Sequence, residues 1–477
     1  MFETGIRQFR MAMAMVNGRR IKPQLIHRLV ADADATMREF GRPGDDVDQL
    51  LDGPFADPET RNHFQTQGLR RTARRLARRS PFYKARFGEA GLDAGAVDPE
   101  TIRTVPVTTK AELVEHTAAF LCRDSRPYLS TRTTGTTGAP AEIWLSRYEA
   151  ELWPAMAALS GLLRNEINRT DCLQINLSSR ATAAVQHDIE VCRLVGARSR
   201  ALGLVAVDDS IDGLLARGNP NAATILGTYP SYLARLVTAA RRRGLGPDDF
   251  ALRRIDVAGE MLSRALATAA HDTFGARPSD TFAMTEVLPV SGRTCGHGHL
   301  HLDLNMGLVE VITLDGSRPA APGELGTMVV TPFFPYRDCT PVFRFDTCDV
   351  VRRLPDEPLT CNLAGVPAVS AILGKAGQLT ATRSGPVTHR DIVEVLEALP
   401  SHPWPAQYRA ATDGGVLRLT IPSATVAGTT TAEIVDRFAA RGIDCRIDVT
   451  ASGEPLRQVR ADLTETTFAT DRTPAGV

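Results

Sequence analysis

The sequence has only four lysines, Lys22, Lys84, Lys110 and Lys375, although lysine and arginine together number 55. It lacks the lysine-containing phosphate loop G-x-x-x-x-G-K-[ST], the hydrolase elbow G-x-S-x-G and the zinc-protease motif H-E-x-x-H. These absences set aside Walker-type nucleotidases, elbow-serine hydrolases and that class of metalloprotease. If the chemistry needs a catalytic lysine, only these four positions can supply it.

The chain also lacks net charge, because 55 acidic residues balance the 55 basic ones. No long-range attraction to nucleic acid or to an anionic membrane follows from it. The eight cysteines show no paired spacing, which favours a reducing compartment over a disulfide framework. The apolar run MAMAMV, flanked by arginines, is too short for a secretory signal or a membrane span. We expect a cytoplasmic protein without nucleic-acid or membrane partners, and leave a homodimer as an open option.

The length and patterning predict an α/β fold with more than one domain. Between 150 and 290, short apolar runs alternate with helical stretches, as in a layered α/β domain: DCLQINLS, SRALGLVAV, AATILGT and RRIDVAG. Residues 302–350 are rich in strand patterns and predict a barrel-like subdomain. After Gly374, helix and strand patterns predict a small α+β domain. We expect an N-terminal extension over 1–58, a large domain over 59–373 and a small C-terminal domain over 374–477.

A basic face marks the helical pattern between 59 and 94, opposite an apolar face of Leu69, Ala73, Leu76 and Ala77. Such a helix can bind nucleic acid or a membrane surface. At zero net charge, a solvated helix face is the better interpretation of Arg70 to Arg79.

The segment STRTTGTTGAP, residues 130–140, lies between two strand-like stretches. Glycine lets backbone N–H groups turn inward and threonine hydroxyls add donors, so such a loop can bind a polyanion. A polar hairpin turn is the alternative. The phosphate-binding hypothesis assigns nucleotide contacts to Thr133, Thr134, Gly135, Thr136, Thr137 and Gly138.

This loop resembles the phosphate loop of the adenylate-forming superfamily, which includes acyl- and aryl-CoA ligases and peptide-synthetase adenylation domains. The segments SPFYKARFGEAGL and VPVTTKAEL, which precede the loop, are similar to the opening of the phenylacetate–CoA ligase branch. The similarity covers roughly residues 60–400. It implies a large N-terminal domain and a small C-terminal domain that rotates between two half-reactions about a hinge.

Further motifs match that branch in the same order. Thr285 and Glu286 match the family's threonine on the α-phosphate and its glutamate on magnesium, after Phe282, Ala283 and Met284. Asp349, in FRFDTCD, matches the aspartate that accepts both ribose hydroxyls, although Cys348 stands where glycine is usual. Lys375 matches the hinge arginine, while Gly377 replaces the hinge aspartate. Two strand-like runs end at Gly259 and Glu260 and at Tyr229, Pro230 and Ser231. The resemblance implies that the first pair borders the nucleotide and that the second group borders the acyl pocket.

The C-terminal region departs from the family, because no lysine follows Lys375. Relatives place a lysine there that bridges carboxylate and α-phosphate. Arg457 and Arg460 are the candidates to replace it, although the planar guanidinium of arginine spreads its charge over a larger group than the compact ammonium of lysine.

A cluster of cysteine and histidine in TCGHGHLHL suggests zinc. Members of the resembled branch hold structural zinc with a Cys/His pair here and a Cys-x-Cys pair farther on. Only Cys361 of that second pair is present, so the predicted ligands are Cys295, His301 and Cys361, with Cys339 or Cys348 to complete the set. A polar turn with solvated histidines is the alternative.

The resemblance implies an AMP-forming ligase that uses ATP and Mg²⁺ to activate a small aryl acid. A thiol, from CoA or a carrier protein, or an amine then takes the acyl group. Two alternatives stay open: a diazotase that activates nitrite and acts on an aryl amine, and a non-catalytic relative that binds nucleotide or a carrier protein.

Overall fold

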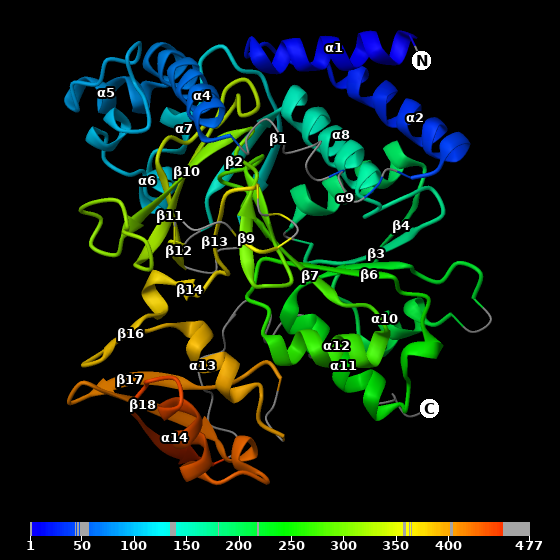
Figure 1. The fold of residues 1–477 in the computed structure, drawn as a ribbon, viewed down its shortest axis with the longest axis vertical. Coiled ribbons are helices and arrows are strands. Elements are labelled where there is room, and N and C mark those ends of the chain that lie inside the picture. Colours follow the sequence, from blue (N-terminus) through cyan, green and yellow to red (C-terminus); the bar gives the residue numbers. More distant parts are fainter. Residues whose placement is uncertain are drawn as a thin grey trace, which may run out of the picture. The chain divides into compact units, whose positions relative to one another are not determined.

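The computed structural model describes residues 2–42, 44, 47, 57–133, 140–179, 181–216, 219–355, 359–361, 363, 365–400 and 404–451. The chain divides into two compact units. Met1–Ala201 and Thr281–Ala371 make the first, and Leu202–Asp280 and Ile372–Val477 make the second. Across the described residues, no helix combines the length and apolar character needed to cross a membrane. Figure 1 shows the elements of both units in chain order.

Helices make up most of the first 200 residues: α1 Phe2–Val16, α2 Pro23–Phe40, α4 Pro58–Arg79, α5 Pro81–Glu89, α6 Lys110–Glu115, α7 Thr117–Phe120, α8 Arg147–Leu163 and α9 Thr182–Val195. Helix α2 packs alongside α8, with Ile26, Leu29 and Val30 buried (Figure 1). Helix α8 begins with a capping box, in which Ser146 and Glu149 satisfy each other's backbone N–H groups.

The described strands of the first unit belong to three sheets. Their bounds are β1 Pro127–Arg132, β2 Glu142–Ser146, β3 Cys172–Asn176, β4 Arg198–Ala201, β8 Ser291–Thr294, β9 His299–Leu302, β10 Gly307–Thr313, β11 Leu325–Pro332, β12 Phe345–Arg352 and β13 Ala368–Ser370, with β7 Pro278–Ala283 at the unit boundary. Strands β1 and β2 form the hairpin predicted around the threonine-rich loop. Strand β11 lies between β10 and β12 in an antiparallel sheet. Strands β7, β8, β9 and β13 are antiparallel neighbours, and β3 pairs with β4 in parallel.

The second unit contains α10 Val207–Leu214, β5 Ile225–Thr228, α11 Pro230–Arg242, β6 Arg254–Ala258, α12 Arg264–Phe274, β14 Gly374–Lys375, β15 Thr380–Thr382, β16 Gly385–Val387, α13 His389–Leu396, β17 Arg409–Asp413, β18 Val416–Pro422, α14 Thr431–Ala439 and β19 Cys445–Thr450. Strands β5 and β6 run parallel. Residues after 386 have a core of their own, built around Ile392, Leu417, Ile434 and Phe438. The α+β pattern predicted for this region is therefore present.

Two predicted strands were wrong in part. The run SRALGLVAV is a strand only to Ala201, because Gly203 takes a φ of 73° and the acidic first turn of α10 begins at Val207. The run PVFRFDT becomes a strand only at Phe345, because Arg344 takes a φ of 49°. The α/β class and the remaining strands agree with the sequence analysis.

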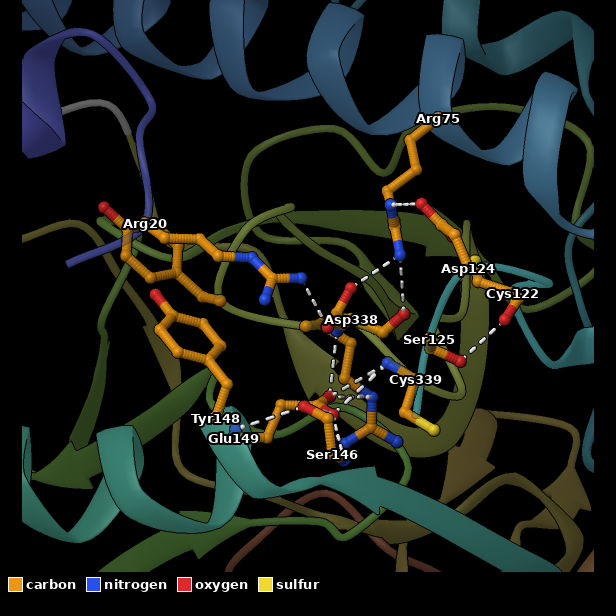
Figure 2. A network of polar contacts seen from close by, with 12 residues as sticks. Arg20, Arg75, Cys122, Asp124, Ser125, Ser146, Tyr148, Glu149, Asp338 and Cys339 are labelled. Atoms are coloured by element: carbon orange, nitrogen blue, oxygen red, sulfur yellow. Dashed lines mark hydrogen bonds and ion pairs between the residues drawn. The ribbon is translucent and has the colours of Figure 1, made fainter. Parts of the chain in front are cut away.

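The arginines of α4 contact other parts of the protein. Arg75 forms ion pairs of 2.7 Å with Asp124 and 2.6 Å with Asp338 (Figure 2), and Arg70 donates to the carbonyl of Val97. Leu69, Ala73 and Leu76 are buried as predicted. Much of the basic face is thus paired within the fold.

Candidate functional site

Thr133 directly follows strand β1, at the base of the threonine-rich loop. Its backbone N–H donates to the Ala141 carbonyl at 3.0 Å, and its hydroxyl accepts from the Ala141 N–H at 3.0 Å. The two ends of the loop are therefore joined in register. The predicted phosphate ligands Thr134, Gly135, Thr136, Thr137 and Gly138 lie outside the described residues.

Glu286 lies in a turn directly after β7 and is 2% exposed. Its Oε1 is 3.3 Å from the Nζ of Lys110, the first residue of α6. Oε1 nevertheless has no hydrogen-bond partner among the described residues. The cation beside this oxygen in the structure is the Lys110 ammonium, and a carboxylate oxygen is also a ligand type that Mg²⁺ prefers. Of its neighbours in the motif, Phe282 is buried, Met284 and Thr285 are half-buried, and Ala283 is exposed.

Residues 108–110, the TTK of VPVTTKAEL, contact both this turn and β12. Thr108 donates its N–H to the Arg344 carbonyl at 2.7 Å and accepts from the Asp346 N–H at 2.9 Å. Thr109 caps α6, which begins with Lys110. The Tyr83 hydroxyl of the PFY segment accepts from the Phe343 N–H at 2.7 Å. Both opening motifs therefore fix the approach to β12.

Asp349 lies in an irregularity of β12, where the pairing with β11 shifts between Thr327 and Val329. It is 5% exposed, and its N–H donates to the Thr347 hydroxyl at 3.1 Å. Cys348 takes a left-handed φ of 57° in this bulge. The glycine usual at this position in the family thus corresponds to a conformation that glycine adopts most easily.

The two predicted strand ends of the second unit lie beside each other at the carboxyl ends of β5 and β6. Tyr229 and Pro230 follow β5 and begin α11, while Gly259 and Glu260 follow β6. Glu260 accepts hydrogen bonds from the Ser231 N–H at 2.7 Å and from the Ser231 hydroxyl at 2.9 Å. Gly259 has a φ of 78°, and a side chain there would begin 3.5 Å from the Tyr229 ring. Carboxyl ends of parallel strands are where such folds bind ligands.

Lys375 lies in β14 of the same unit. Its N–H donates to the Gln378 Oε1 at 2.8 Å, so a glutamine caps the turn in which Gly377 replaces the family's aspartate. Arg457 and Arg460, the candidates for the missing lysine, lie outside the described residues.

Four residues of the first unit bring potential metal-ligand atoms within 4.8 Å of one another: Cys295, His299, His301 and Cys361. His301 Nε2 is 3.3 Å from the Cys361 Sγ, and its Nδ1 is 2.9 Å from the Val366 carbonyl. A carbonyl at Nδ1 fixes the tautomer that leaves Nε2 for a metal. A Cys₂His₂ set suits zinc. The fourth member is His299, and neither Cys339 nor Cys348 belongs to the group.

Sequence reasoning missed two contributors. His299 could have been found, because residues two apart in a strand point to the same face as His301. Lys110 could not, because its contact with Glu286 joins distant segments of the chain.

No protein-family model matches the chain. A phenylacetate-coenzyme A ligase from Thermus thermophilus is 24% identical over 355 residues, which cover 71% of this chain and 75% of that protein. A 2-hydroxyisobutyryl-CoA ligase structure, in the postadenylation state with R3-HIB-AMP, has a TM-score of 0.70 at 18% identity, over 85% of this chain and 89% of the other. ATP-bound MatB from Rhodopseudomonas palustris has a TM-score of 0.51 at 17% identity, over 67% of this chain and 63% of the other.

These likenesses agree with the α/β fold predicted from the sequence. The chain has the fold of the adenylate-forming superfamily, and within it resembles the phenylacetate–CoA ligase-like branch.

Proposed function

We propose that the protein is an AMP-forming ligase that activates a small acid with ATP and Mg²⁺ and transfers it to a thiol. The observation that carries this proposal is the buried Glu286 carboxylate after β7, whose Oε1 lies 3.3 Å from Lys110 Nζ and accepts no hydrogen bond in the described part of the chain. The phenylacetate-coenzyme A ligase relative supports the reaction class. A bound magnesium ion would neutralise phosphate charge and hold the triphosphate in line with the acid.

In the proposed reaction, an oxygen of the acid attacks the α-phosphorus of ATP. The bond from that phosphorus to the bridging oxygen breaks, and pyrophosphate leaves. The mixed anhydride with AMP is then attacked at its acyl carbon by a thiolate, which releases AMP and forms a thioester. The protein contributes mainly by positioning two anions and stabilising developing charge.

Each motif has a role in this scheme. The amides and hydroxyls of Thr133 to Gly138 hold the β- and γ-phosphates, and Thr285 contacts the α-phosphate. Asp349, in the irregular part of β12, accepts the ribose hydroxyls. Gly259 and Glu260 border the nucleotide, while Tyr229, Pro230 and Ser231 border the acid. Arg457 or Arg460 supplies positive charge at the α-phosphate.

We propose residues 374–477 as the mobile C-terminal domain, with Lys375 at its hinge. The separate core around Ile392 and Phe438 supports this division. The substrate class we propose is a small aryl or arylacetic acid, with CoA as the thiol. We further propose zinc, held by Cys295, His299, His301 and Cys361, as a structural ion.

A pyrophosphate-release screen tests the reaction. Purified protein is given MgATP with aryl acids, arylacetic acids and short hydroxy acids, and separately with nitrite plus aminoaryl acids. Acid-dependent pyrophosphate release supports the proposal. Release only with nitrite, accompanied by a diazo chromophore, would replace it with the diazotase. Nucleotide binding in calorimetry without turnover on any acid would favour the non-catalytic relative.

A further inference from the structure

The loop 259–263, between β6 and α12, is held from two sides within the second unit. On one side, Glu260 accepts hydrogen bonds from the N–H and the hydroxyl of Ser231. On the other side, the contacts come from α13, in the C-terminal part of the chain. The reaction proposed above assigns Gly259 and Glu260 to the border of the nucleotide, and it gives no role to α13.

Glu394 of α13 accepts the first backbone N–H of α12. Its Oε1 and Oε2 lie 3.3 Å and 3.4 Å from the nitrogen of Arg264. The first N–H groups of a helix have no partner within that helix, and they form its positive end. A carboxylate from α13 therefore satisfies one of these donors at the point where the loop enters α12. Glu394 is buried, with 8% exposure, so the contact is shielded from water.

Arg390, one turn earlier in α13, joins the same loop to the residues that precede β14. Its Nη1 donates to the Leu262 carbonyl at 3.1 Å and to Glu394 Oε1 at 3.0 Å. Its Nε donates to the Ile372 carbonyl at 2.7 Å, and its backbone N–H donates to the Leu373 carbonyl at 2.9 Å. The planar guanidinium thus holds acceptors from three segments at once, which the compact ammonium of a lysine would not do in this geometry.

Apolar contacts extend this interface in both directions. Met261 of the loop packs against the apolar core of the residues after 386. Trp404, which follows α13, packs against the core that contains side chains of α11 and α12, and the Arg241 guanidinium carbon lies 5.7 Å from the centre of its ring. The hydrogen bonds of Arg390 and Glu394 are therefore part of a packed interface and not isolated surface contacts.

The loop is too short for its two ends to move independently. Only one residue separates Glu260 from Leu262, whose carbonyl accepts from Arg390. A residue spans at most about 3.6 Å, so a displacement of Leu262 is passed on to Glu260. Gly259, with a φ of 78°, has more backbone freedom than other residues, so the loop depends on outside contacts to keep its position.

We propose that Arg390 and Glu394 are positioning residues for nucleotide binding: from the C-terminal domain, they hold the loop 259–263 in place at the border of the nucleotide. The inference rests on the proposed function, from which it takes the role of that loop. Nucleotide affinity then depends on whether the C-terminal domain is docked on the loop. A rotation of that domain away from the loop loosens the border of the nucleotide.

Calorimetry of AMP binding to the whole protein tests this inference, because it requires no metal and no acid. Arg390→Met removes the side-chain donors and Glu394→Leu removes the acceptor, so each should raise the AMP Kd about tenfold. The double variant should stay within about twofold of either single variant, because both residues hold the same loop. Glu394→Gln should bind within about threefold of wild type, because an amide oxygen can replace Oε1, which accepts from both Arg264 and Arg390.

Glu433→Gln is the matched control in the same part of the chain. Glu433 also accepts a backbone N–H at the start of a helix, from Thr430 at 2.7 Å, but it is exposed in α14. Its AMP Kd should stay within about twofold of wild type. The inference is overturned by an unchanged AMP Kd in both Arg390→Met and Glu394→Leu, by an equal rise in Glu433→Gln, or by a Glu394→Gln variant that binds as weakly as Glu394→Leu.

If the Arg390 and Glu394 variants do not fold, hydrogen exchange in the wild type decides. Binding and docking stabilise each other, so AMP should slow the exchange of two amides. These are the N–H of Arg264, which donates to Glu394, and the N–H of Arg390, which donates to the Leu373 carbonyl. Slower exchange in the loop 259–263 without any change in α13 would overturn the inference. A wild type that binds neither AMP nor ATP would instead refute the proposed function itself, and this inference with it.

Discussion

Cys348 takes a left-handed backbone conformation, with a φ of 57°, directly before the buried Asp349. For a residue with a Cβ, this conformation is less favourable than for glycine by about 1–2 kcal/mol. We predict that Cys348→Gly raises the free energy of unfolding by about 1 kcal/mol, whereas Cys348→Val lowers it. Urea denaturation checks both, and Cys445→Gly, which replaces a buried strand residue, should destabilise. An unchanged Cys348→Gly variant would mean that the bulge carries no such strain.

Asp349→Asn should remove the discrimination between ATP and 2′-deoxy-ATP. Wild type should prefer ATP, because a carboxylate accepts from both ribose hydroxyls while an amide oxygen replaces only part of that capacity. The ratio of the KM for 2′-deoxy-ATP to the KM for ATP should fall about tenfold, measured by pyrophosphate release. Asp346→Asn, three residues earlier in β12, serves as the control, because the amide oxygen can still accept from the Cys348 N–H. Retained discrimination in Asp349→Asn would place the ribose elsewhere.

Glu286→Gln should lower the rate of pyrophosphate formation by about 10²- to 10³-fold, since it removes a preorganised charge at the phosphates. The amide keeps the size of the side chain but binds a hard cation poorly. The rate should also need a higher Mg²⁺ concentration for saturation than the wild-type rate does. The exposed Glu115→Gln, on the same α6 helix as Lys110, should behave as wild type. A Glu286→Gln enzyme with unchanged rate and magnesium dependence would remove this residue from the metal site.

The Cys/His cluster should hold one zinc per chain, measured by elemental analysis of protein purified without chelator. Cys361→Ser should lose the metal and lower the thermal midpoint, because a structural ion contributes its binding free energy to folding. Cys445→Ser, another buried thiol, should keep full zinc content. Metal content equal to wild type in Cys361→Ser would reject the assignment.

Local sequence patterns predicted the elements that carry the site but not their contacts. The positions of Glu286 and Asp349 after β7 and within β12 followed from motif order and alternation. The sequence alone showed that Cys348 differs from the family pattern, because glycine is usual at that position. In contrast, the strand predicted over SRALGLVAV ends early, at Ala201, before the left-handed Gly203. The pairing of Lys110 with Glu286 depends on tertiary packing, which no local sequence pattern encodes.

The most direct test of the account follows oxygen from the acid to the nucleotide. The protein is incubated with MgATP, CoA and a carboxylic acid labelled with ¹⁸O in its carboxyl group, chosen from the acids active in the pyrophosphate screen, and the AMP is analysed by mass spectrometry. Attack of the acid on the α-phosphorus predicts one ¹⁸O in AMP and unlabelled pyrophosphate. Label in inorganic phosphate, with ADP as the nucleotide product, would contradict the central claim.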